Sequence, residues 1–215
     1  ISYLSKKARK MLVEAGLTAC KITASNALDE YLIRDLMMQG AKIDTFGVGE
    51  RLITAKSSPV FGGVYKLAAV EDEDGNIIPK IKISENTAKI TNPHFKRLYR
   101  FYDSEGKALA DELCLRDEVI DESKPLTIFD QNAVWKTKTL TDFTVRDLQV
   151  QIFKNGEPVY DLPDLKDIQA YCRRQIGTLW DEVKRFENPH TYYVDLSKKL
   201  WDEKRRLLEE KEYII

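Results

Sequence analysis

The sequence predicts an α/β fold, and three observations lead to that prediction. The first part of the chain alternates amphipathic helices with short apolar strands, joined by connections of a few residues. The middle part has apolar runs on both sides of an Asp-Gly turn, which is typical of antiparallel strands. The last part returns to three- and four-residue apolar spacing, which predicts helices. We therefore expect a parallel α/β segment, then antiparallel strands, then a helical C-terminal region.

The parallel segment is predicted element by element. Its first helix has apolar residues at helical spacing and ends at Gly16; these residues are Leu4, Ala8, Met11, Leu12 and Ala15. Residues 21–24 and 43–46 predict two short strands, and a helical run between them ends at Gly40. Two parallel strands alone leave open edges, and the chain begins Ile1-Ser2 in place of an initiator Met. We therefore expect the chain to be part of a longer protein.

The middle of the chain predicts antiparallel strands. Residues 64–70 and 77–83 flank a turn that ends at Gly75. Residues 96–102 predict a further strand, because basic residues alternate there with aromatic or apolar ones, and a turn follows.

The end of the chain predicts helices. Residues 108–163 contain short apolar runs and turns, residues 165–186 predict one long amphipathic helix, and residues 196–208 predict a last helix. The expected parts of the chain are residues 1–70, 71–107 and 108–215.

The composition excludes several classes of protein. The chain has 34 Lys and Arg against 35 Asp and Glu, a net charge of −1, with both signs interspersed. This balance gives no basic surface for nucleic acid or an anionic membrane. No apolar run approaches the roughly 20 residues that a membrane-spanning helix needs, and no signal peptide is visible. We expect a cytoplasmic protein without nucleic-acid or membrane partners.

Cysteine and histidine usage predicts no metal site. Cys20, Cys114 and Cys172 lie far apart without metal-ligand spacing, so we expect three free thiols, most of them buried. The two histidines, His94 and His190, are too few for a His-rich metal site or a Ser/His/Asp arrangement.

The best local candidate for a binding site is residues 46–50, FGVGE, after the second strand. The small residues Gly47, Val48 and Gly49 allow main-chain amides to approach a phosphate near the start of a helix. By itself, such a motif favours a tight strand-to-helix turn.

Ser25 and Asn26 hold the equivalent place after the first strand. They could contact a ligand oxygen, but both are also favoured helix N-caps, and capping is the expected role of one of them. The coincidence of two such loops supports a ligand site, because ligands bind at the carboxyl ends of parallel strands.

Longer motifs give a more specific indication. The chain resembles the C-terminal half of the nicotinate phosphoribosyltransferase family, in the form found in Gram-positive bacteria. The resemblance covers essentially the whole chain and is carried by residues 3–12 (YLSKKARKML), 24–30 (ASNALDE), 46–52 (FGVGERL), 62–67 (GGVYKL), 79–86 (PKIKISEN) and 179–190 (LWDEVKRFENPH).

This resemblance implies an enzyme of NAD salvage. The family joins nicotinate to phosphoribosyl pyrophosphate, forming nicotinate mononucleotide and pyrophosphate with coupled ATP hydrolysis. The implied fold is the closing part of an irregular α/β barrel of the type II phosphoribosyltransferase kind, up to about residue 70, with the hairpin returning to a second domain. The implied partners are the two substrates, Mg-ATP and the missing N-terminal half of the same polypeptide. We expect no cofactor to be bound tightly by this chain. A homodimer is a possible assembly.

The resemblance also assigns the candidate site. The family's phosphate loop corresponds to Gly47, Val48 and Gly49, and the loop beside it corresponds to Ser25 and Asn26. Two positions differ from the family pattern: Ala27 replaces a common Asp and Glu50 replaces a common Thr. Neither histidine lies in a matching motif, so we assign no catalytic residue and expect the chain alone to be inactive.

Two alternatives remain at this stage. The chain could be a non-catalytic assembly module that uses its C-terminal helices for association, or a sister phosphoribosyltransferase that acts on nicotinamide or quinolinate. Oligomerisation without phosphate or nucleotide affinity would favour the first alternative.

Overall fold

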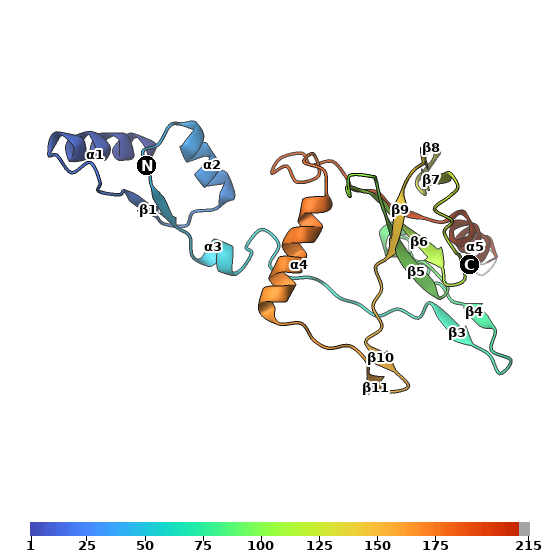
Figure 1. Cartoon of the computed structure of the whole chain (residues 1–215). Helices are drawn as coiled ribbons and strands as arrows, with labels where there is room; N and C mark the ends of the chain where they lie inside the picture. Colours follow the sequence, from blue (N-terminus) through green and yellow to red (C-terminus); the bar gives the residue numbers. More distant parts are fainter. Residues whose placement is uncertain (211–215) are drawn as a thin grey trace. The chain divides into compact units, whose positions relative to one another are not determined.

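The structure, a computed structural model, describes residues 1–210. It contains two compact units, Ile1–Val64 and Tyr65–Ile215 (Figure 1). Both combine helices and strands, as the sequence predicts, but the described strands form separate small sheets and no closed barrel. No helix in residues 1–210 is long and apolar enough to cross a membrane.

The first unit alternates helices and strands as expected. Its elements in order are α1 (Ser2–Glu14), β1 (Thr23–Ser25), α2 (Glu30–Met38), β2 (Thr45–Gly47) and α3 (Glu50–Ile53). The two strands pair in parallel, which confirms the predicted orientation. Gly16 and Gly40 follow α1 and α2 with φ of 74° and 68°, left-handed values that glycine adopts at little cost.

The core of this unit lies between α2 and the two strands. It consists of the buried residues Ala24, Leu28, Leu36 and Ala41. In α1, by contrast, the buried residues are Ser2 and Ser5, while Leu4 and Met11 are about two-thirds exposed at 63% and 61%. The apolar stripe that predicts α1 is therefore only partly covered in this unit, with Leu4, Met11 and Ala15 exposed and Ala8 and Leu12 half-buried.

The second unit is built on one four-stranded sheet. Its strands are β5 (Lys96–Tyr102), β6 (Ala108–Leu115), β9 (Thr144–Asp147) and β12 (Val194–Leu196), in the order β12-β6-β5-β9. The β5 and β6 strands form the central antiparallel pair (Figure 1). The β12 strand joins β6 in parallel. The prediction of a strand at residues 96–102 is confirmed in its bounds.

Smaller elements complete the second unit. Three antiparallel pairs are β3 (Ala69–Glu71) with β4 (Ile77–Pro79), β7 (Leu126–Asp130) with β8 (Ala133–Leu140), and β10 (Phe153–Lys154) with β11 (Glu157–Pro158). The helical elements are the 3-10 turn η1 (Thr87–Lys89), α4 (Leu165–Thr178) and α5 (Lys198–Glu209).

The core of the second unit lies between the four-stranded sheet and the β7–β8 hairpin. Phe101 and Phe143 meet edge to face, with ring centroids 5.4 Å apart, and Ile128 and Leu140 of the hairpin pack against them. Cys114 is also buried there, whereas Cys20 and Cys172 are exposed. The three thiols are free as expected, but the prediction that most of them are buried is wrong.

Two predicted helix boundaries are wrong. The helix expected over residues 165–186 ends at Thr178, where Leu179 turns to an extended conformation with ψ of 150°. Leu196 belongs to β12, and the last helix begins at Lys198 because the Ser197 side chain caps it. Apolar spacing continues past both boundaries, and the sequence pattern alone does not reveal the change.

Candidate functional site

The candidate site lies at the carboxyl ends of β1 and β2. The parallel register pairs Ser25 with Gly47, so the two predicted loops begin side by side. The Ser25 hydroxyl donates to the Gly47 carbonyl at 3.3 Å. Four of the five predicted site residues are exposed at this edge: Ser25, Asn26, Gly47 and Gly49. The structure thus brings together the residues that the sequence motifs singled out.

Gly47 and Gly49 occupy different environments. A Cβ atom at Gly47 would lie 3.1 Å from the Ser25 Oγ and 3.3 Å from its Cβ, so glycine permits this close approach of the strands. A Cβ atom at Gly49 would meet no protein atom within 4 Å. The first glycine therefore serves packing, and the second leaves space next to the main chain.

Val48 lies between these glycines and turns its side chain inward. That side chain packs against the core of the first unit. Across residues 1–210, the main-chain amides of Val48 and Gly49 donate to no carbonyl or side chain. Unpaired amides at an exposed loop are suited to bind an anion. The helix that follows adds little, because α3 has four residues.

The loop after β1 has an unusual backbone. Asn26 and Ala27 both have positive φ values, 111° and 47°. Alanine reaches this region at a cost of about 1 kcal/mol. Consecutive left-handed residues at a strand end are typical of loops whose shape serves binding.

The expected capping role of Ser25 or Asn26 is wrong. The N-cap of α2 is Asp29, whose carboxylate accepts from the Leu32 amide at 2.9 Å. Neither Ser25 nor Asn26 is needed to cap the helix, and both are left for other contacts. The signal in the sequence was an Asp directly before Glu30, a favoured cap arrangement.

Sequence reasoning also missed the ion pair between Asp29 and Arg51. The Arg51 guanidinium donates to the Asp29 carboxylate and so joins the segment after β1 to α3, which follows β2. The hydrogen bond from Leu32 and the contact with Arg51 hold the pKa of Asp29 below its ordinary value. The Arg51 Nε atom is buried and has no hydrogen-bond partner in the described part of the chain.

The described residues do not form a resident metal centre. Within residues 1–210, no group of three or more His, Cys, Asp or Glu side chains could hold a metal ion. The site at the strand ends offers main-chain amides, a hydroxyl, a carboxamide and a guanidinium. This set of donors fits an oxyanion.

Comparison with known proteins gives a consistent family. Residues 95–204 match the family model described as the nicotinate phosphoribosyltransferase C-terminal domain. The chain is 44% identical over 98% of its length to the nicotinate phosphoribosyltransferase of Bacillus subtilis strain 168, and 34% identical over 94% to that of Dictyostelium discoideum. It spans 43% and 36% of those relatives.

A solved structure agrees at the level of the fold. The crystal structure of human nicotinic acid phosphoribosyltransferase matches 96% of this chain with a TM-score of 0.68 and 23% identity. The match covers 38% of the human chain. The fold of this chain is thus similar to part of the human protein, and the chain spans less than half the length of these relatives.

Proposed function

Because the chain belongs to the nicotinate phosphoribosyltransferase C-terminal domain family, we propose that it is the C-terminal portion of a nicotinate phosphoribosyltransferase. The complete enzyme would form nicotinate mononucleotide and pyrophosphate from nicotinate and phosphoribosyl pyrophosphate, with coupled ATP hydrolysis. It would act in the salvage of NAD, in the cytoplasm. The 44% identity along nearly the whole chain is the observation that supports this proposal most strongly.

The part of the reaction that we assign to this chain is binding of the 5′-phosphate. The amides of Val48 and Gly49 would donate to the phosphate oxygens, and Ser25 and Asn26 would approach from the neighbouring loop. The closely paired strand ends support this assignment, since Gly47 lets Ser25 lie against the loop that carries both amides. The Asp29–Arg51 ion pair would keep the two loops together and present Arg51 to the anion.

A phosphate cradle orients the substrate but does not accelerate its chemistry alone. Transfer of the ribosyl group develops positive charge at the anomeric carbon and negative charge on the departing pyrophosphate. A site at the far end of the substrate stabilises the substrate and the transition state equally, and uniform binding leaves the chemical step unchanged. We therefore assign no catalytic residue and propose that the groups at the reacting centre come from the remainder of the enzyme.

The remainder of the enzyme would also complete the fold. In this proposal β1 and β2 are two strands of an irregular α/β barrel, and residues missing from this chain supply its other strands. Mg-ATP enters as a substrate. Within residues 1–210, no group of three or more His, Cys, Asp or Glu side chains comes together to hold its metal ion.

Titration with ribose 5-phosphate tests the cradle directly. In amide-resolved NMR spectra of the chain, ribose 5-phosphate should shift the Val48 and Gly49 amides, because hydrogen bonds to an anion change their environment. Ribose without the phosphate is the control and should leave them in place. Shifts confined to other segments, or equal shifts with ribose, would contradict the assignment.

A further inference from the structure

The second unit contains a cavity that the proposed function does not use. It has a volume of about 900 Å³ and lies between the β7–β8 hairpin and the segment that leads into β12. A volume of this size falls within the range of small-molecule sites. Charged and aromatic side chains line it, including Asp130, Lys138, Trp180, His190, Tyr192 and Asp195.

Asp195 is the most informative residue of this cavity. Its main chain pairs with Glu112 between β12 and β6, and the residue is 8% exposed. Yet its carboxylate accepts no hydrogen bond and forms no ion pair with any residue from 1 to 210, although it lines the cavity. Buried carboxylates are normally paired, because an isolated buried charge is costly.

Two polar groups near Asp195 in the sequence, Tyr192 and Ser197, already have partners. Tyr192 donates to Asp111 at 2.9 Å, and Asp111 accepts two hydrogen bonds from Arg100. Ser197 donates to Glu118 at 2.6 Å. The Thr191 and Tyr193 hydroxyls also line the cavity, but within residues 1–210 neither donates to Asp195, so a partner for its carboxylate can enter from the cavity.

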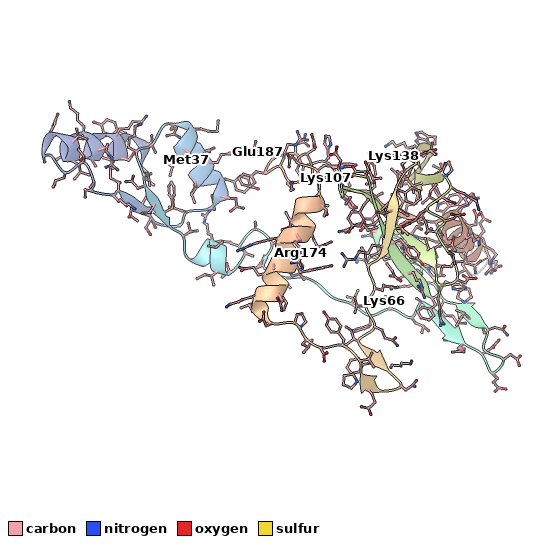
Figure 2. The ribbon with its side chains drawn as sticks, viewed as in Figure 1. Met37, Lys66, Lys107, Lys138, Arg174 and Glu187 are labelled. Atoms are coloured by element: carbon pink, nitrogen blue, oxygen red, sulfur yellow. The ribbon has the colours of Figure 1, made fainter. Side chains whose placement is uncertain are left out.

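The other charged groups of the cavity do not neutralise Asp195. Asp130 adds a second carboxylate, which accepts from the Asn132 amide at 2.8 Å. Burial first, and then the charge of Asp130, raise the pKa of Asp195 to about 6. Lys138, labelled in Figure 2, holds its ammonium 5.2 Å from the centre of the Trp180 ring, and Lys136 is exposed. Within the described chain, neither lysine forms an ion pair with a carboxylate of the cavity.

We propose that this cavity binds an organic cation, an ammonium or amidinium group on an aromatic or apolar body, with Asp195 as its counter-ion. Asp130 would supply the second negative charge. The rings of Tyr192 and Trp180 already lie beside Arg100 and Lys138, so they would contact the apolar body of the ligand and leave its cationic group to the carboxylates. A metal ion fits less well, because no three metal-binding side chains come together in residues 1–210. A free amine and a basic protein side chain share this chemistry.

Calorimetric titration of the chain with benzamidine tests the proposal. Benzamidine carries an amidinium on an aromatic ring, and neutral benzamide is its matched control. We expect benzamidine to bind and benzamide to bind at least tenfold more weakly, because only the cation pairs with the carboxylate. Blocked arginine, acetylated and amidated, is the second probe. Tighter binding of benzamidine indicates a free small molecule as the source, tighter binding of arginine indicates a protein side chain, and either supports a cation site.

Two variants locate the binding. Asp195→Asn should weaken benzamidine binding at least tenfold, since the amide keeps the shape of the side chain and loses its charge. Asp202→Asn is the matched control, because Asp202 lies on the exposed face of α5 and pairs with Lys198; its affinity should equal that of the wild type. Tryptophan fluorescence checks folding, since Trp135, Trp180 and Trp201 all belong to the second unit.

A measurement on the wild type keeps the proposal testable if Asp195→Asn fails to fold. Carboxyl NMR of Asp195 should show its pKa fall from about 6 when benzamidine saturates the chain, because a bound cation favours the carboxylate. An unchanged pKa, equal affinities for benzamidine and benzamide, unaltered binding by a folded Asp195→Asn variant, or no binding of either cation would each overturn the proposal. None of these results depends on phosphoribosyl transfer, so they leave the proposed function untouched.

Discussion

Gly47 and Gly49 differ in what surrounds them, and this difference predicts that the same substitution has unequal effects on stability at the two positions. Gly47→Ala should destabilise the first unit by about 1 kcal/mol, because the new methyl group lies against Ser25. Gly49→Ala should cost less stability, because beyond its chain neighbours the new methyl group meets no protein atom within 4 Å. Hydrogen exchange of residues 1–64 in both variants measures the difference. Equal protection in the two variants would contradict the packing role of Gly47.

The space beside Gly49 should instead matter for the substrate. A hybrid enzyme, in which this chain replaces the matching 43% of the Bacillus subtilis relative, provides the complete protein. Gly49→Val in this hybrid should raise the KM for phosphoribosyl pyrophosphate roughly 10- to 100-fold, because the side chain displaces an anion from the loop amides. The KM for nicotinate is the internal control. An unchanged KM for phosphoribosyl pyrophosphate would place the phosphate elsewhere.

Asp29 serves both as a helix cap and as the partner of Arg51, and two substitutions separate these roles. Asp29→Asn keeps a capping oxygen and loses the charge, whereas Asp29→Ala loses both. Protection of residues 1–64 from hydrogen exchange should fall in the order wild type, Asn, Ala. Equal protection in the two variants would mean that the ion pair accounts for the whole effect.

The pH dependence of Asp29 has a definite sign. Its folded-state pKa lies below the ordinary value of 3.8, so its carboxylate stabilises the folded unit above that pH. This contribution is lost as the pH falls through the folded pKa. The difference in stability between the wild type and Asp29→Asn should therefore shrink as the pH falls into strong acid. Hydrogen exchange of residues 1–64 at several pH values measures this difference.

The candidate site shows how far residue patterns can predict contacts. Motifs identified the loops at Ser25 and Gly47, because small and polar residues directly after a strand indicate a loop whose main chain can approach a ligand. They missed the pairing of Asp29 with Arg51, because 22 positions separate the two residues and only the register of β1 and β2 brings them together.

At the scale of elements, the spacing of apolar residues predicted whether a segment is a helix or a strand better than it predicted where the segment begins and ends. The strand at residues 96–102 was predicted because one of its faces is buried and the other is partly exposed. The end of α4 and the β12 strand were missed because apolar residues continue through Leu179 and Leu196. Leu196 is buried by pairing with a strand 83 positions earlier, at Leu113, and helical spacing carries no information about such a partner.

The β6 strand carries a buried acid that predicts a pH effect on the second unit. Burial, with smaller contributions from Glu118 and Asp195, raises the pKa of Glu112 from 4.5 to about 7. Between these values the folded state holds a proton that the unfolded state has lost, so stability falls as the pH rises. The loss attributable to Glu112 is on the order of 3 kcal/mol.

Substitution of Glu112 measures this effect. Glu112→Gln should flatten the decline in stability between mildly acidic and neutral pH, because glutamine does not titrate. Glu105→Gln is the matched control, since Glu105 is exposed in the turn before β6. Denaturant unfolding followed by tryptophan fluorescence reports on the second unit alone, where all three tryptophans lie. Parallel pH profiles for wild type and Glu112→Gln would contradict the account.

At the scale of the whole molecule, the family motifs gave a more specific prediction of the fold than the periodicity of apolar residues could. Helix and strand patterns indicated α/β structure, but a pair of three-residue parallel strands does not specify a barrel. The division of the chain into residues 1–70, 71–107 and 108–215 stays a prediction. Residues 211–215 of the last part lie outside the described residues. The partly covered apolar stripe of α1, with Leu4 and Met11 exposed, is consistent with a unit that packs against further chain.

The central claim is that this chain supplies a phosphate site to an enzyme whose reacting centre lies elsewhere. Formation of nicotinate mononucleotide from nicotinate, phosphoribosyl pyrophosphate and Mg-ATP tests it most directly, with this chain and the hybrid enzyme at equal concentration. We predict product from the hybrid and none from the chain alone, because oriented binding of the phosphate leaves the anomeric carbon without stabilising groups. Turnover by the chain alone comparable to that of the hybrid would contradict the claim.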